Sequence, residues 1–416
     1  MADAADVLRR HIKPGYRVLL GTGAGEPLTL ERALVEIAAE LPGLTLLSGL
    51  QLSDYPFMAP VRAGLWSYET WHVMPPVRDD IAAGRVHFHP SRGSLLLELI
   101  GKLRPDVFLA AVAPQRAGRF SFGASVSYAR PMAEAVPTIV EVNAKMPVTA
   151  GESSISSHGF GLTVETDHAL PVHRAEAPDE IARRIAEHVR PLIPNGATLQ
   201  MGIGAVPEAV MALIAEDPPY ELVLFGMGVD GMVDVMERNL RLQFVGGELL
   251  GSSRLYDFAH DNSRVRLFDN RDILSIARLR ERPRFVSLQG AIEVDLWGQV
   301  NTEFAKGRQV SGAGGGFDFI EGSWESEGGL SIIALPATAR GGDVSRIVFR
   351  LDPGTPVSVP RHTVRYVVTE NGIADLFGLS LDQRAQALVS IADPRFRDAL
   401  WNAADAHLSA GKGAGR

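Results

Sequence analysis

Two glycine turns carry the clearest chemical pattern in the sequence, because each follows a hydrophobic run and precedes a predicted helix. They occupy residues 21–25 and 202–204, and Pro207 stands at the expected start of the second helix. Glycine lets the backbone approach a ligand, and the free N–H groups at a helix start favour an anion or a developing oxyanion. Proline suits the first helical position, where its missing N–H has no partner. The pattern predicts ligand-binding turns, with purely structural strand-to-helix turns as the alternative.

Two later segments could join these turns in one site. Residues 311–316 form a glycine-rich stretch, which Phe317 and Phe319 follow on either side of an acid. These aromatic residues favour a shaped loop that lines a cleft, rather than a flexible linker. Glu370 follows the apolar run 366–369, so it would lie at the carboxyl end of a buried strand. Sites in open parallel sheets lie at that edge, although a hydrogen-bonded structural carboxylate is the alternative.

The elements that must position these residues form a repeating α/β pattern. Short β-rich runs alternate with helical periodicity, which predicts mainly parallel sheets flanked by helices. The run 106–113 is apolar without alternation, as expected for a strand buried on both faces. A chain of 416 residues predicts two domains, 1–175 and 176–416. The predicted strands are 17–20, 44–47, 107–112, 138–142, 198–201, 222–225, 285–288, 331–335 and 366–369, and the predicted helices are 30–41, 178–192 (stopping or kinking near His188 because of Pro191) and 207–215.

Composition and charge exclude several classes of protein. The net charge is −8 and the sequence contains no basic stripe, so we do not expect nucleic-acid binding. The absence of cysteine removes disulfides, thiolate metal sites and a cysteine nucleophile, and fits a reducing compartment. No apolar run approaches the ~20 residues that span a bilayer, and the first residues lack a signal-peptide core. We therefore expect a cytoplasmic enzyme that does not bind membranes.

Three cofactor and mechanism classes are also disfavoured. Glu26 stands where a dinucleotide fingerprint requires its third glycine, so we do not expect NAD. His87 and His89 could share one face of a strand, but no third metal ligand stands at a suitable spacing, and we expect no metal. The sequence holds no Gly-X-Ser-X-Gly, which removes the nucleophile elbow of serine hydrolases.

Several motifs in order along the chain resemble the acetyl-CoA hydrolase/transferase family, and within it the 4-hydroxybutyrate CoA-transferase branch. The resemblance runs from about residue 15 to about residue 400 and implies two CoA-transferase-type (NagB/RpiA-like) α/β domains, with the active site between them. It also implies CoA or acyl-CoA and an acceptor acid as substrates, and a homodimer. The motifs are 200–207, 254–258, 293–296 with 298–300, 312–315 and 369–376, together with 141–143 and 146–147.

In that family a glutamate attacks the acyl-CoA thioester, forms a mixed anhydride and then holds CoA as an enzyme thioester until a second carboxylate collects it. The resemblance points to the backbone amides of Ile203 and Gly315 as oxyanion donors. It places substrate-binding residues at Gln200, Gly202, Gly204, Gly226, Met227, Gly312 and Gly314.

The sequence departs from the family pattern at the glutamate itself. Gly226 stands where the family has that residue, and Gln289 stands where the family usually has an asparagine near the thioester. One hypothesis is direct acyl transfer or hydrolysis, with Glu370 or Asp230 as the base. A second is a non-catalytic binder of CoA or acyl-CoA. A third keeps the covalent step and moves the carboxylate to Glu370 or Glu293.

Overall fold

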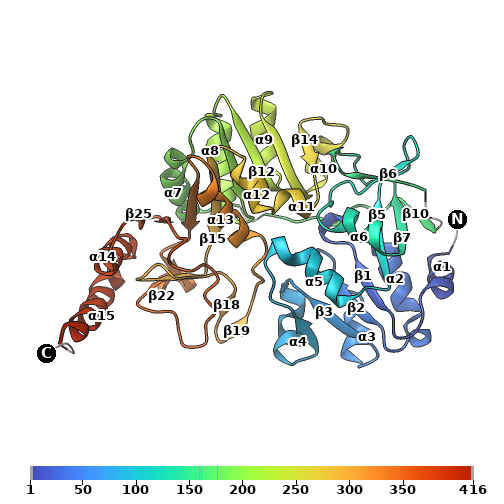
Figure 1. Cartoon of the computed structure of the whole chain (residues 1–416), viewed down its shortest axis with the longest axis horizontal. Helices are drawn as coiled ribbons and strands as arrows, with labels where there is room; N and C mark the ends of the chain where they lie inside the picture. Colours follow the sequence, from blue (N-terminus) through green and yellow to red (C-terminus); the bar gives the residue numbers. More distant parts are fainter. Residues whose placement is uncertain (1–2, 159, 161, 176, 414–416) are drawn as a thin grey trace.

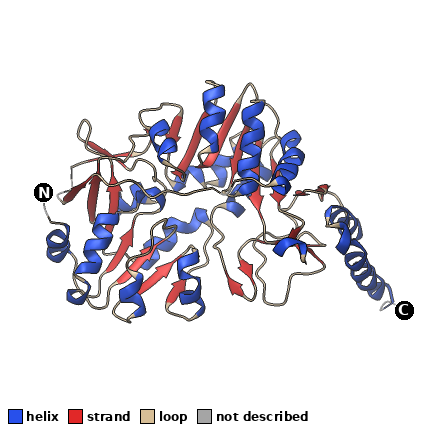
Figure 2. Cartoon of the chain, turned by 180° about the vertical axis from the view of Figure 1, so that it is seen from behind, coloured by secondary structure: helices blue, strands red, loops and turns tan. Residues whose placement is uncertain are grey.

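The chain folds into two α/β halves that lie side by side, each a sheet packed against helices (Figures 1 and 2). The structure is a computed structural model and describes residues 3–158, 160, 162–175 and 177–413. The C-terminal helix projects from the second half, at the end of the molecule opposite the N-terminus (Figure 1).

The first half is built on a seven-stranded sheet in which every pair of neighbours is parallel. All six residues of its central strand β5 (Val107–Val112) are buried, which confirms the strand predicted from the apolar run. The strand order is β10 (Thr163–Thr166), β7 (Thr138–Asn143), β5, β1 (Arg17–Leu20), β2 (Thr45–Ser48), β3 (Ser67–Thr70) and β4 (Val86–Phe88). The helices of this half are α1 (Ala4–His11), α2 (Leu28–Glu36), α3 (Met58–Arg62), α4 (Arg78–Ala82), α5 (Leu96–Leu103) and α6 (Ala129–Ala135).

The second half is built on a nine-stranded sheet, which is parallel except for the pairing of its edge strand β25 with β24. The order is β25 (Gly372–Asp375), β24 (Tyr366–Thr369), β20 (Leu330–Ala334), β15 (Phe285–Gly290), β11 (Ala197–Met201), β12 (Leu222–Gly228), β13 (Gln243–Leu249), β14 (Val265–Leu267) and β8 (Ala150–Gly151). The helices are α7 (Glu180–Val189), α8 (Ala205–Glu216), α9 (Gly231–Arg238), α10 (Ser253–Ala259), α11 (Asn270–Ile273), α12 (Ile276–Arg280), α13 (Gly316–Glu325), α14 (Leu381–Ile391) and α15 (Pro394–Gly413).

The sequence-based elements agree with the structure except near their ends. Every predicted strand is present within a few residues, and α7 ends at Val189, where Pro191 enters a 3₁₀ turn. Helix α8 begins at Ala205 after Gly204, so the prediction that Pro207 occupies the first helical position was wrong by one half-turn. Strand β13 was not predicted, because its two glycines and its charged residue weaken the β-strand pattern.

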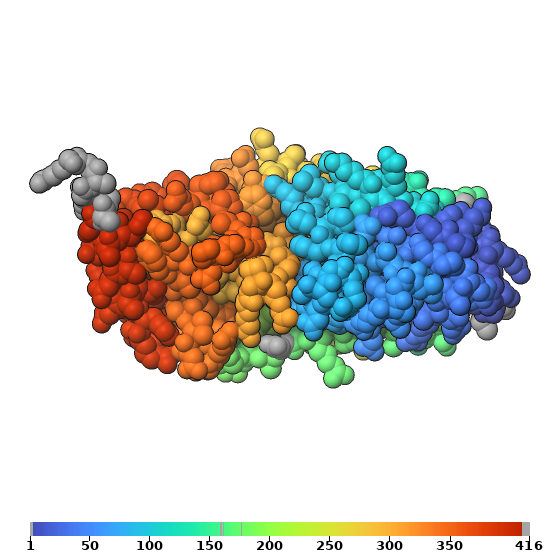
Figure 3. Space-filling model, turned by 90° about the horizontal axis from the view of Figure 1, so that it is seen from below, coloured from blue at the N-terminus to red at the C-terminus, as the bar shows by residue number. Residues whose placement is uncertain are grey.

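Backbone pairing and a shared core join the two halves. The Leu249 N–H donates to the Ala124 carbonyl at 2.8 Å, and the Val126 N–H donates to the Gly247 carbonyl at 2.9 Å. One hydrophobic cluster contains side chains from the central strands of both sheets. Figure 3 shows the halves in direct contact. The predicted boundary after residue 175 falls between β10 and α7, although β8 crosses to the second sheet.

Candidate active site

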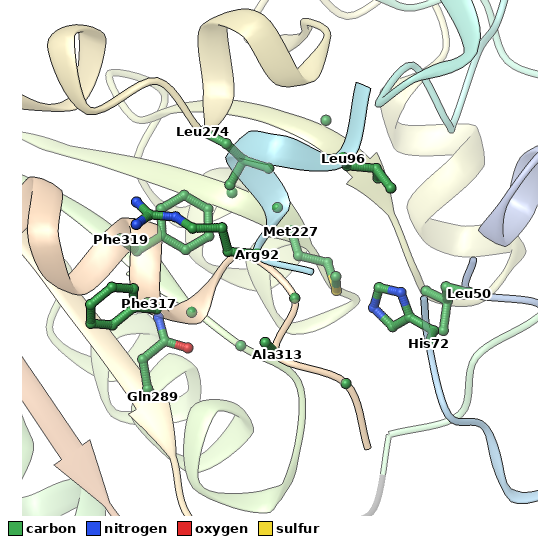
Figure 4. A pocket seen from close by; sticks show the side chains of 18 of the residues that line it. Leu50, His72, Arg92, Leu96, Met227, Leu274, Gln289, Ala313, Phe317 and Phe319 are labelled. Carbon is green, nitrogen blue, oxygen red and sulfur yellow. The ribbon is translucent and has the colours of Figure 1, made fainter. Parts of the chain in front are cut away.

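A pocket of about 320 Å³ lies between the two halves, and we call it the interdomain pocket. It opens beside the carboxyl ends of several parallel strands of both sheets, the edge at which α/β proteins bind ligands. Figure 4 shows side chains converging on it from both halves. Residues that line it include Thr22, Leu50, Trp71, His72, Arg92, Leu96 and Tyr128 from the first half, and Gln200, Gly202, Gly226, Met227, Glu248, Gln289 and residues 311–317 from the second.

Three polar side chains form a network on the floor of the pocket, at the ends of β11 and β15. The Ser287 hydroxyl donates to Oε1 of Gln200 at 3.1 Å, and Nε2 of Gln289 donates both to that oxygen and to the Ser287 hydroxyl. Oε1 of Gln289 is left facing the start of α13, 3.2 Å from where a Cβ on Gly316 would lie. The network therefore fixes Gln289 with its carbonyl oxygen toward the glycine-rich segment.

The glycine loop, residues 311–316, covers the pocket from the second half, as predicted. Its backbone packs closely on the first half, since the Gly93 N–H donates to the Gly314 carbonyl at 2.8 Å. Arg92 fastens the same region, because its Nε and Nη2 atoms pair with Asp318 and Glu321, each at 2.5 Å. Gly315 is the residue that caps α13, so its backbone lies at a helix N-terminus that faces the pocket.

Gly226 occupies a backbone conformation that suits glycine and not glutamate. Its φ angle is +97°, and the register between β12 and β13 shifts directly after it. A Cβ added there would lie 3.1 Å from Cγ of Gln200. A side chain at 226 would therefore be strained as well as crowded. The backbone at 226 therefore favours glycine over the glutamate that the family resemblance predicts at this position.

Glu248 supplies a carboxylate close to Gly226. It lies on β13, directly opposite Met227 in the parallel ladder, and strands in a sheet lie ~4.8 Å apart. Residues paired across neighbouring strands point to the same face, and both of these line the pocket. The Oε2 atom is buried and has no hydrogen-bond partner among the described residues. It lies 3.3 Å from where a Cβ on Gly23 would be, so the first glycine turn also borders the site.

The surroundings of Glu248 make its carboxylate unusually basic. Burial raises the pKa of Glu248 to about 8, although hydrogen bonding by the Ser125 and Ser127 side chains lowers it in part. Desolvation penalises the charged form of a carboxyl group, so the proton is held more tightly. Perturbed carboxyl groups of this kind in a cleft are candidates for covalent or acid–base chemistry.

The pocket brings together most of the predicted site residues and leaves out others. Gln200, Gly202, Gly226, Met227, Gln289, Gly312, Gly314 and Gly315 line it. Ile203 and Gly204 do not line the pocket, and the Ile203 side chain is exposed.

Three predicted carboxylates also lie elsewhere, engaged in structural bonds. Asp230 accepts hydrogen bonds from the backbone and hydroxyl of Ser252. Glu370 accepts from the Ala337 N–H at 2.9 Å, and Glu293 accepts from Asn301 at 2.9 Å. None of the three lines the interdomain pocket, so their catalytic roles stay sequence-based predictions.

Two residues that sequence analysis did not single out stand in the pocket, Glu248 and His72. A signal for Glu248 was present, because it is an isolated acid within the otherwise apolar and glycine-rich residues 244–251. His72 follows β3 with no local motif around it, so only the fold reveals its position.

Over the residues that the structure describes, we find no helix that is long and apolar enough to cross a membrane. Over the same residues, no group of three or more histidine, aspartate or glutamate side chains is arranged to hold a metal ion.

Comparison with known proteins agrees with this architecture. The chain matches the acetyl-CoA hydrolase/transferase N-terminal domain over residues 3–166 and the C-terminal domain of the same family over residues 251–404. It is 34% identical to the 4-hydroxybutyrate coenzyme A transferase of Clostridium kluyveri, over 93% of each chain. It is 33% identical to the butyryl-CoA:acetate CoA-transferase of Anaerostipes caccae, over 95% of this chain and 94% of that one.

Two solved structures are similar to this fold over nearly the whole chain. RipA from Yersinia pestis superposes with a TM-score of 0.90 at 28% identity, covering 98% of this chain and 97% of that one. A 4-hydroxybutyrate CoA-transferase from Porphyromonas gingivalis superposes with a TM-score of 0.81 at 30% identity, covering 96% and 95%. Fold, pocket and similarity together define an enzyme of the CoA-transferase and acyl-CoA hydrolase type. The chain belongs to the acetyl-CoA hydrolase/transferase family.

Proposed function

We propose that this enzyme transfers CoA between carboxylic acids and that Glu248 carries the covalent step. The observation that supports the proposal most is the position of Glu248, whose Oε2 is buried and unpartnered in the interdomain pocket. The Ser125 and Ser127 side chains compensate the burial of this carboxyl group only in part, and a buried oxygen without a partner is costly to maintain, which a structural role does not explain. The proposal corresponds to the relocated carboxylate considered from the sequence, with Glu248 in place of Glu370 or Glu293.

The chemistry needs no group beyond Glu248 and the two substrates. The Glu248 carboxylate attacks the thioester carbonyl of acyl-CoA, and the C–S bond breaks to give a mixed anhydride and the CoA thiolate. The thiolate then attacks the Glu248 carbonyl, releasing the first acid as its carboxylate and leaving CoA on Glu248 as a thioester. An acceptor carboxylate repeats these two steps in reverse order. It leaves as acyl-CoA and restores the Glu248 carboxylate.

The neighbouring groups suit this sequence of steps. Each attack on a carbonyl places negative charge on its oxygen, and an N–H at a helix start stabilises such a charge. Gly315, at the start of α13, borders the pocket at the position where the resemblance predicts an oxyanion donor. The raised pKa of Glu248 also makes its carboxylate a stronger nucleophile once ionised.

Direct transfer without a covalent intermediate and non-catalytic binding are the competing functions. Intact-protein mass spectrometry after mixing with acyl-CoA separates them from the proposal. We expect a CoA adduct in the wild type and in Glu370→Gln, and none in Glu248→Gln. An adduct that persists in Glu248→Gln but disappears in Glu370→Gln would move the covalent step to Glu370. Turnover without any adduct would favour direct transfer, and CoA binding without turnover would favour a binder.

A further inference from the structure

Ser125 is a buried serine of the first half to which the proposed chemistry gives no role. It lies on the connection between β6 (Arg119–Ser121) and α6. Its Oγ atom is buried and has no hydrogen-bond partner among the described residues. Most buried hydroxyls in proteins donate to an acceptor, so an unpaired one beside an active site points to a bond that forms at another stage of the reaction.

Ser125 lies directly beside Glu248, across the contact between the two halves. The two residues pair in an isolated antiparallel bridge, and the backbone hydrogen bonds that join the halves flank this pair. In such a non-hydrogen-bonded pair the Cα atoms are about 4.5 Å apart and the side chains lie close together on one face. The Ser125 hydroxyl is therefore held against the Glu248 carboxyl group.

The first glycine turn leaves the space in which these two side chains meet. A Cβ on Gly23 would lie 3.3 Å from Oε2 of Glu248. A Cβ on Gly25 would lie 2.8 Å from Cβ of Ser125 and 3.3 Å from its Oγ. The Glu248 Oε2 and the Ser125 Oγ therefore lie against the same short turn.

The two oxygen atoms of Glu248 differ in their surroundings. Oε2 is the buried oxygen, on the side of the first glycine turn. Glu248 as a whole is half-buried, and Oε1 is not enclosed in the same way, so Oε1 is the oxygen that faces the pocket. In the proposed reaction Oε1 attacks the thioester, and Oε2 stays as the carbonyl oxygen of the glutamyl anhydride.

The proposed reaction forms an oxyanion at two different carbons. When Oε1 attacks the thioester, the charge develops on the substrate's oxygen. When the CoA thiolate attacks Cδ of Glu248, the new C–S bond pushes the carbonyl electron pair onto Oε2. Collapse re-forms that carbonyl, breaks the bond between Cδ and Oε1 and releases the first acid with this oxygen. The second oxyanion therefore needs a donor on the buried side of Glu248.

The neighbouring donors on that side are already used. The Gly23 N–H donates to the Leu50 carbonyl at 2.8 Å. The Ser127 hydroxyl donates to Oδ1 of Asn270 at 3.2 Å, and a hydroxyl has one proton to give. The Ser125 hydroxyl keeps its proton free for Oε2.

We propose that Ser125 is a catalytic residue, whose hydroxyl donates to Oε2 of Glu248 when negative charge develops on that oxygen. The inference rests on the proposed function, because it requires the covalent step at Glu248. The same donor serves the attack of the acceptor acid on the enzyme thioester, since that attack occurs at the same carbon.

The resting contact between the two side chains fits this role. Ser125 is close enough to lower the pKa of Glu248, yet its oxygen forms no hydrogen bond of normal length and angle. A bond that strengthens as charge grows on Oε2 stabilises the transition state more than the ground state, which is the condition for catalysis.

The partition of the anhydride between CoA transfer and hydrolysis tests the role of Ser125. Water that attacks the acyl carbon of the anhydride releases the acid and restores the Glu248 carboxylate, with no charge on Oε2. With acetyl-CoA as donor and butanoate as acceptor, Ser125→Ala should lower the ratio of transfer to hydrolysis by about 100-fold, the effect of removing one oxyanion donor. Both routes start from the same anhydride, so a change in the ionisation of Glu248 alone would leave this ratio unchanged.

Two further variants separate the hydroxyl from the surrounding structure. Ser125→Cys keeps a weak donor and should give a ratio between those of the wild type and Ser125→Ala. Ser121→Ala is the matched control, because it removes a buried hydroxyl of the same segment that is bonded to Ser153 and Gly123 and does not line the pocket. Its ratio should stay within about threefold of the wild type.

Thermal unfolding adds a reading that does not depend on turnover. The midpoint of Ser125→Ala should match the wild type, because the lost hydroxyl made no hydrogen bond, whereas Ser121→Ala should unfold at a lower temperature. A lowered midpoint in Ser125→Ala together with an unchanged ratio would assign this serine a structural role and overturn the inference.

Two other outcomes also decide the matter. An unchanged ratio in Ser125→Ala, with the CoA adduct still on Glu248 in the wild type, would refute the role of Ser125 and leave the covalent step standing. A wild type that forms no adduct on Glu248 would refute the proposed function and the role of Ser125 with it.

Discussion

The unusual environment of Glu248 predicts a distinctive dependence of the first half-reaction on pH. With a pKa of about 8, roughly one molecule in a hundred carries the ionised carboxylate at pH 6, about one in ten at pH 7 and about half at pH 8. Only the carboxylate attacks the thioester. The value of kcat/KM for acyl-CoA should therefore rise about tenfold from pH 6 to pH 7 and level off above pH 8. A glutamate with an ordinary pKa would give a flat profile over the same range.

The assay is the rate of enzyme–CoA adduct formation at low acyl-CoA concentration, measured in steps from pH 6 to pH 9. Two neighbouring groups do not titrate in that window, since burial lowers the pKa of His72 to about 4 and raises that of Tyr128 well above its usual range. A single rising limb with a midpoint near pH 8 is the expected result. A flat profile, or the same limb in the residual activity of Glu248→Gln, would refute the reasoning.

Two further substitutions test the geometry around this carboxylate. Adding Gly226→Glu to Glu248→Gln should not restore the CoA adduct, because φ at 226 is +97° and a Cβ there crowds Gln200. Intact-protein mass spectrometry measures the adduct, and the midpoint of unfolding measures the stability of the double variant. A restored adduct would show that either strand can hold the nucleophile. Asp318→Asn should lower the free energy of unfolding by about 1–3 kcal/mol, because the buried Asp318 binds Arg92 across the two halves; an unchanged midpoint in chemical denaturation would contradict this.

Local sequence patterns were sufficient for the central strands of both sheets, but not for β3, β4, β13 and β14. A buried parallel strand, a glycine turn and a helix start are features of a few consecutive residues, which is why residues 202 and 312–315 could be predicted as parts of ligand-binding turns, whereas Gly226 was singled out by the family resemblance. The family resemblance added the expectation that the two halves would enclose the site between them.

The positions of Glu248 and His72 depend on contacts between segments that are distant in the sequence. Local sequence patterns do not predict such contacts. Glu248 reaches the pocket because β13 pairs with β12 in one particular register and with residues 124–127 of the first half. A shift of one residue would turn its side chain to the other face of the sheet. His72 borders the pocket because the glycine loop, more than 200 residues later, folds over it. Glu370 was predicted from strand ends alone, a rule that does not say which strand end faces the cleft.

The most direct test of the account is to identify the residue that acyl-CoA modifies covalently. Borohydride reduces an enzyme thioester to an alcohol that survives digestion, so the modified residue can be placed by fragment mass spectrometry. The account predicts this modification on Glu248 and on no other carboxylate. A stable modification on a different residue, or productive CoA transfer in a protein that is never modified, would contradict it.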